Sequence, residues 1–271
     1  MLFLTIYSKE PTIKQIDLGV IMKSYFNNYR KLKYFTVACS LVFFTQALEA
    51  KSTNYETIGI CTMSQNILQD QIFTGMDVTY SNPQAAKDDA RKDIKKQLEL
   101  LKKEKLSKQL HKSVLSLDSS WSKIEKKLKV KTKKENSLSL YTQVNSFTKD
   151  CETVSTKLDK KKSDIEKMQV ATLNLKVQTL TALYAIKSWD AINDKDYNAK
   201  VTNLLKSYET IYKKLNNSKS KVNQDILEKL NKEFTAFKFM TTSSSGRYMP
   251  VLAAKKASSI DALTTQILEG K

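Results

Sequence analysis

A short stretch of the chain, CTMSQNILQDQIF at residues 61–73, combines helical spacing of apolar residues with side chains that can bind a ligand. The hydroxyl of Ser64 and the amides of Gln65 and Gln71 lie on or beside the apolar face. Each group forms hydrogen bonds, and burial without a partner costs about 1–3 kcal/mol. Two alternatives follow: these groups line a pocket for a small polar ligand, or they bond across to a neighbouring helix.

Few residues have the types and spacing that catalysis needs. The chain has one histidine, His111, with no second ligand at metal-binding spacing. It has no glycine-rich phosphate loop and no recognisable Ser/His/Asp arrangement. We therefore expect a protein that is not an enzyme and that uses no metal or cofactor.

The composition indicates an all-α protein. Only five glycines and three prolines occur among 271 residues, whereas a turn-rich sheet protein of this length would carry many more. The remaining chain is dominated by lysine, leucine, serine, threonine and acidic residues, which favour long amphipathic helices.

The N-terminus has the pattern of a targeting segment. Basic residues after Met22 are followed by the uncharged run YFTVACSLVFFTQAL at 34–48. This order is typical of a secretory signal peptide, and the apolar centre is shorter than the roughly 18–20 residues of a membrane-spanning helix. We expect residues 1–50 to be the signal peptide, with the true start at Met22 and the mature protein in the periplasm. An uncleaved membrane anchor is the alternative.

The chain is strongly basic, with a formal net charge of +18. Of its 46 basic residues only three are arginine, and the lysines are spread along amphipathic segments together with acidic residues. Such lysines most often form solvated helix faces. Because no recognition motif appears and the chain carries an export signal, we expect no nucleic-acid partner.

Comparison of the sequence with itself reveals a repeat at an offset of 113 residues. Trp121 falls on Phe234, Gln65 falls on Gln178, and apolar positions match in three separate segments. We infer two copies of one unit, at about 51–162 and 163–271. Gln178 joins the candidate ligand-binding residues because it is the one polar position of the stretch that both copies keep.

Breaks in the helical pattern divide each copy into four helices. In the first copy we expect helices at 54–79, from Pro83 to about 105, at 107–130 and from about 136 onward. In the third of these helices a stripe of apolar residues predicts one buried face: Leu110, Val114, Leu117, Trp121, Ile124 and Leu128.

The second copy breaks at 193–196, 216–220 and 241–250. Short connections imply antiparallel neighbours, so we expect two tandem antiparallel four-helix bundles. Residues 137–190 contain no proline or glycine, which predicts one long continuous helix joining the bundles in an elongated rod.

Two cysteines remain after the signal peptide, Cys61 and Cys151. Cys61 lies about seven residues into the first helix and Cys151 about ten residues before the end of the fourth, and these helices should be antiparallel neighbours. The two thiols therefore come to similar heights. A structural disulfide is the prediction for an oxidising compartment, and two unpaired thiols are the alternative.

The order of these features resembles a known sensor family. Met63-Ser64-Gln65 at the start of an apolar helix, a second helix and then Trp121 in a third all lie within about 110 residues. This order resembles the PilJ-type domain, the N-terminal sensor module of type IV pilus methyl-accepting chemotaxis transducers, which is related to the periplasmic domain of NarX-like nitrate sensor kinases. In the second copy LTALYAIKSWD at 180–190 is similar to the end of the family's first helix, and SSIDALTTQI at 258–267 to its fourth.

The chain departs from the family at its anion-binding arginines. The family's first helix typically reads RMLSQR, and in nitrate sensors an arginine of this helix contributes to anion binding at a dimer interface. Cys61 and Asn66 stand at the arginine positions of the first copy, and Asn174 and Thr179 at those of the second. None of these side chains supplies the fixed charge and forked donors of a guanidinium, so we do not expect nitrate binding.

We therefore expect an exported, non-enzymatic sensory or binding protein with a small polar ligand near Ser64, Gln65, Gln71 and Gln178. Signalling would need a membrane-bound transducer or kinase as partner, and the resemblance leaves a homodimer open. The alternative is a structural or interaction protein of the cell envelope that has lost ligand binding.

Overall fold

The computed structural model describes residues 54–78, 84–158, 162–217, 220–243 and 248–270. All regular structure in these ranges is helical, which confirms the all-α prediction. The predicted signal peptide at 1–50, including Met22, and the expected helix start at Pro83 lie outside the described residues. None of the described helices combines the length and apolar character needed to cross a membrane.

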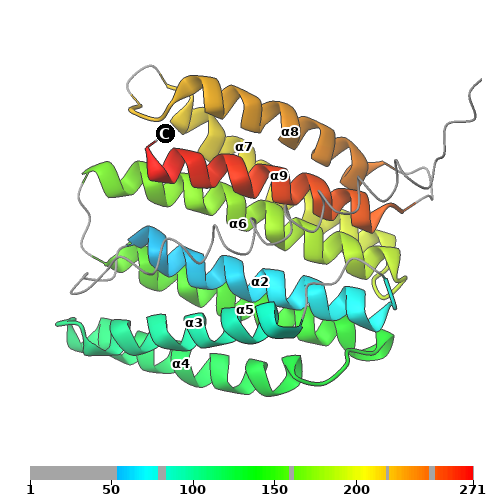
Figure 1. Ribbon diagram of the computed structural model, residues 1–271, viewed down its shortest axis with the longest axis horizontal. Coiled ribbons are helices and arrows are strands. Elements are labelled where there is room, and N and C mark those ends of the chain that lie inside the picture. The colour runs from blue at the N-terminus through cyan, green and yellow to red at the C-terminus, as the bar shows by residue number, and fades with distance from the viewer. Residues whose placement is uncertain (1–53, 79–83, 159–161, 218–219, 244–247, 271) are drawn as a thin grey trace, which may run out of the picture.

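The first half of the fold consists of α2 (Asn54–Gly75), α3 (Gln84–Lys103), α4 (Lys108–Leu128) and α5 (Lys134–Lys157). The second half consists of α6 (Lys162–Ser188), α7 (Asp194–Leu215), α8 (Gln224–Thr242) and α9 (Pro250–Glu269). In each half every helix contacts at least two others of that half, so that the four close a ring. Figure 1 shows the helices as stacked pairs, with α3–α4 and α7–α8 outermost and α2–α5 and α6–α9 between them.

Polar side chains fix several helix ends where the sequence predicted breaks. The Ser107 hydroxyl accepts a hydrogen bond from the Leu110 backbone N–H at 3.3 Å and caps α4. Asn193 caps α7 in the same way, with its side-chain oxygen 2.9 Å from the Asp196 nitrogen. Pro250 occupies the first turn of α9, where its missing N–H costs nothing.

The outer and central helices differ in how many of their faces are buried. The predicted stripe of α4, from Leu110 to Leu128, is buried along one face only, which confirms that prediction. In α6, by contrast, every residue from 177 to 187 is buried, and in α2 every residue from 60 to 73 except Asn66. A helix that is buried all round must lie at the centre of the fold, since both of its faces need apolar neighbours.

The prediction of one continuous helix through residues 137–190 is wrong. Helix α5 ends at Lys157, and Leu158 has an extended backbone with φ −68° and ψ 150°. Helix α6 then packs against α2, so the halves lie side by side and not end to end (Figure 1). Burying the second apolar face of both α2 and α6 favours this packing, because a rod would leave those faces in water.

Helices α2 and α6 run parallel to each other. Residues that are 113 positions apart in the sequence lie at nearly the same height on the two helices. At one end the Lys167 ammonium lies 5.4 Å from the centre of the Tyr55 ring. At the other end a Cβ on Gly75 would lie 2.5 Å from the Trp189 side chain, so only glycine allows this approach. Asp77 and Asp190, which are 113 positions apart, both have a φ of 55° just after these helices. The two halves are thus related by an approximate internal symmetry.

Candidate functional site

The polar residues predicted on α2 are all buried. Ser64 is fully buried, and its hydroxyl donates to the Cys61 carbonyl at 2.7 Å. The amide nitrogen of Gln65 donates to the Thr148 hydroxyl of α5 at 3.0 Å, while its oxygen has no hydrogen-bond donor among the described residues. Gln71 is buried further along the helix. None of these three lines the cavity described next.

A cavity of about 80 Å³ lies between α2 of the first half and α6 and α9 of the second, which we call the inter-half cavity. Helix α9 makes hardly any backbone contact with α2, and the cavity occupies the space between them. Its apolar lining is Tyr55, Gly59, Met63, Ala171 and Leu268. Its polar lining is Glu56, Thr62, Asn66, Asn174, Asp261 and Thr265. The cavity exceeds the roughly 10–15 Å³ that one water molecule needs, so it can hold a molecule of a few non-hydrogen atoms.

Asp261 is the carboxylate that α9 contributes to the cavity wall. Its side chain is partly buried and accepts a hydrogen bond from the Asn174 amide at 2.5 Å. Burial raises the pKa of Asp261 to about 6, and the Asn174 hydrogen bond offsets only part of that rise. The lining residues carry no positive charge. The cavity therefore holds a carboxylate whose charge is only weakly compensated.

The predicted residue Gln178 lies behind the cavity wall. Its amide nitrogen donates to the Asn174 side-chain oxygen at 3.1 Å and to the Ala257 carbonyl at 3.3 Å. Because Asn174 in turn bonds to Asp261, a chain of hydrogen bonds holds the carboxylate in place. Gln178 therefore positions the cavity wall without lining the cavity.

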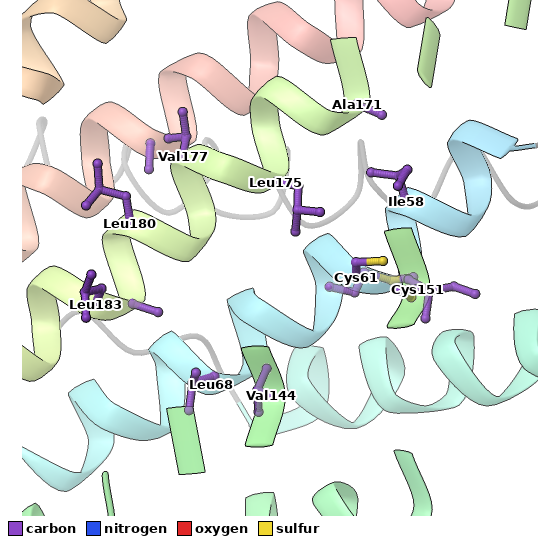
Figure 2. Packing of buried hydrophobic residues seen from close by; sticks show 14 of the residues in the cluster. Ile58, Cys61, Leu68, Val144, Cys151, Ala171, Leu175, Val177, Leu180 and Leu183 are labelled. Atoms are coloured by element: carbon purple, nitrogen blue, oxygen red, sulfur yellow. The ribbon is translucent and has the colours of Figure 1, made fainter. Parts of the chain in front are cut away.

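The two cysteines come together as the antiparallel argument requires. Both thiols are buried and donate to the same carbonyl, that of Thr57, at 3.4 Å from Cys61 and 3.6 Å from Cys151. Figure 2 shows the two sulfur atoms side by side between α2 and α5. Burial and the neighbouring thiol raise the pKa of Cys61 well above its ordinary value. Both are free thiols here, so the disulfide stays a prediction.

Several lining residues were missed by sequence reasoning. Asp261 lies in the helix segment 258–267, where the first copy has Thr148 at the equivalent position. A charged residue in one copy at a position that is buried in the other copy indicates a candidate site. Alignment of the two copies at the 113-residue offset could have revealed this signal. Asn174 and Asn66 had been noted as replacements of the family's arginines, and both line the cavity.

Comparison of the chain with protein-family models, with curated proteins and with solved structures finds no match. The resemblance to PilJ-type domains therefore rests on the order of residues in the chain, and the function has to be argued from the cavity itself.

Proposed function

We propose that this protein is an exported sensory or binding protein that holds a small polar ligand in the inter-half cavity. The observation that carries the proposal is the convergence of polar side chains from both halves on one cavity, with the weakly compensated carboxylate of Asp261 in its wall. Ligand pockets commonly combine an apolar lining with a few fixed polar groups, and this cavity has that composition.

The resemblance to sensor modules agrees with this location. In the related nitrate sensors the ligand contacts the first helix at a dimer interface. Here the corresponding helices are α2 and α6, which pack against each other within one chain. Asn66 and Asn174, which stand at two of the family's arginine positions, both line the cavity. Neutral amides replace guanidinium groups there, so a ligand other than nitrate is favoured.

Binding at this place can produce a signal because the cavity is lined by residues of both halves. A ligand that contacts α2 and α9 together adds an interaction that depends on how the halves pack. It therefore shifts the population towards the packing in which both contacts are made. A membrane-bound transducer or kinase that recognises one packing would transmit the change.

A thermal-shift screen tests the proposal. The full chain is heated with small cations, anions and neutral polar molecules, each at one ionic strength. A ligand at one hundred times its Kd adds about 2.7 kcal/mol to the free energy of unfolding. For a chain of this size we expect the Tm to rise by roughly 5–10 °C, at about 2–4 °C per kcal/mol.

The matched control is Ala171→Ile, which fills the cavity with the side chain that the first half carries at the equivalent position, Ile58. Ligand-induced stabilisation should disappear in this variant while its helix content is unchanged. A ligand that stabilises both proteins equally binds elsewhere and contradicts the proposal.

The alternative, an interaction protein of the cell envelope, has one observation in its favour. Large apolar side chains are exposed near the end of α8 and at the start of α9: Phe239 at 73%, Tyr248 at 39%, Met249 at 47% and Leu252 at 42%. Exposed large apolar side chains favour a protein partner where they form one surface. This function predicts that Phe239→Ser abolishes capture of an envelope protein by cross-linking, and that no small molecule raises the Tm.

A further inference from the structure

The 113-residue offset relates the inter-half cavity to a second place between the halves, where α6 meets α2 and α5, and an ammonium group lies there. The 113-residue offset relates Met63 on α2 to Lys176 on α6, and Thr265 on α9 to Glu152 on α5. Lys176 extends from α6 and forms an ion pair with Glu152. Only 15% of the Lys176 side chain and 24% of the Glu152 side chain are exposed. A primary ammonium ion is therefore held, largely buried, at the place that corresponds to the cavity.

The same comparison explains why the inter-half cavity is open. The cavity has Thr62 and Ala171 where its counterpart has the larger residues Leu175 and Ile58, both fully or almost fully buried. It also has Met63 in place of the lysine. The substitutions remove volume and remove the positive charge together. A carboxylate is present at a neighbouring position, since Asp261 lies one helical turn from Thr265, the counterpart of Glu152.

The charged residues that line the cavity have one sign. Its two ionisable carboxyl groups are Glu56 from α2 and Asp261 from α9, and no lysine or arginine lines it. Lys167, on the cavity-lining helix α6, lies over the ring of Tyr55. A carboxylate removed from water needs a cation or several donors to offset its lost hydration, and the single Asn174 amide supplies one donor.

We infer that the inter-half cavity binds a small primary ammonium ion, whose nitrogen pairs with Asp261 in the way that Lys176 pairs with Glu152. This inference rests on the proposed function and specifies its ligand. The ammonium group has three N–H donors, of which one meets the Asp261 carboxylate, and the side-chain oxygens of Thr62, Asn66 and Thr265 are acceptors in the same lining. The carbon part of the ligand packs against Met63, Tyr55 and Leu268.

The inference predicts which classes of ligand bind tightly and which bind weakly. A tetramethylammonium ion has the charge but no N–H donor, and it is bulkier than a primary ammonium group. Propionamide has N–H donors but no charge. Nitrate has the wrong charge for a lining with two carboxyl groups. We therefore expect propylammonium to bind and the other three to bind at least tenfold more weakly.

Isothermal titration calorimetry of the full chain at pH 7.5 with propylammonium chloride tests this inference. Asp261→Asn keeps the shape and the hydrogen bond to Asn174 but removes the charge, so we expect the affinity to fall at least tenfold. The matched control Glu209→Gln removes a surface carboxylate from α7, which does not line the cavity, and should bind like the wild type. Met63→Lys places a tethered ammonium in the cavity, as Lys176 does at the counterpart of the cavity, and should abolish binding.

Unchanged affinity in Asp261→Asn, or in Met63→Lys, would overturn the inference. If nitrate or propionamide binds more tightly than propylammonium and Ala171→Ile blocks that binding, the ammonium inference fails and the proposed function stands. If no compound of any charge binds, both fail.

Discussion

Replacing Asp261 with asparagine should make the unliganded protein more stable at neutral pH. The pKa of this group rises from 3.8 to about 6 on folding, chiefly through burial. One pKa unit corresponds to about 1.36 kcal/mol, so the charged form costs the folded state about 3 kcal/mol at most. Because the folded pKa is the higher one, this cost is absent below pH 3.8, grows between pH 3.8 and 6, and is complete above pH 6.

The assay is urea unfolding followed by circular dichroism at a series of pH values between 4 and 8. At pH 7.5 the free energy of unfolding of Asp261→Asn should exceed that of the wild type by about 1–3 kcal/mol. The difference should shrink towards zero at pH 4. The comparison is made between variants, since the many other carboxyl groups titrate equally in both.

Glu209→Gln is the control here as well, because this exposed carboxylate pairs with Lys238 at 2.6 Å on the surface. Its effect should be within about 1 kcal/mol at every pH, as for other exposed ion pairs. The reasoning is refuted if Asp261→Asn is less stable than the wild type at pH 7.5. It is refuted as well if the gain is the same at pH 4, since the carboxylate charge would then not be its cause.

Three further predictions follow from the packing. Gly75→Ala should lower the free energy of unfolding by about 2–4 kcal/mol, since its Cβ would lie 2.3 Å from a carbonyl oxygen and 2.5 Å from an indole ring; an unchanged urea midpoint would contradict the contact between the halves. Met63→Lys should couple to Asp261→Asn in a double-mutant cycle by about 1.5–3 kcal/mol, as a charge-assisted hydrogen bond does, and additive effects would place the lysine outside the cavity. Oxidised glutathione should link Cys61 to Cys151 and stabilise the protein by about 2–4 kcal/mol; since this exchange passes through a mixed disulfide, one that persists at equilibrium, seen by mass spectrometry, would show that the sulfurs do not meet.

The periodic parts of the fold could be predicted from the sequence. The stripe on α4 and the cap residues Ser107 and Asn193 are local signals, which depend on a few neighbouring residues. The end of α5 was missed because Leu158 is an ordinary helix former, and neither glycine nor proline marks the break. The side-by-side packing of the halves depends on the burial of α2 and α6 on all sides. The prediction from the sequence assumed one buried face for each helix, so it did not find this packing.

The site was less predictable because its residues come from distant parts of the chain. Ser64 and Gln65 drew attention as polar groups on an apolar helix, yet they bond to their own helix and to α5. The cavity depends on which face of α2 meets α6 and α9, and only the tertiary packing determines that. Gln178, which was predicted as a ligand-binding residue, supports Asn174 and through it Asp261 without lining the cavity.

A crystal structure of the protein grown with propylammonium chloride tests the central claim most directly. The account predicts the ligand between α2, α6 and α9, with its nitrogen about 2.7–2.9 Å from a carboxylate oxygen of Asp261. A ligand bound elsewhere, or an inter-half cavity filled by the protein's own side chains, would contradict it.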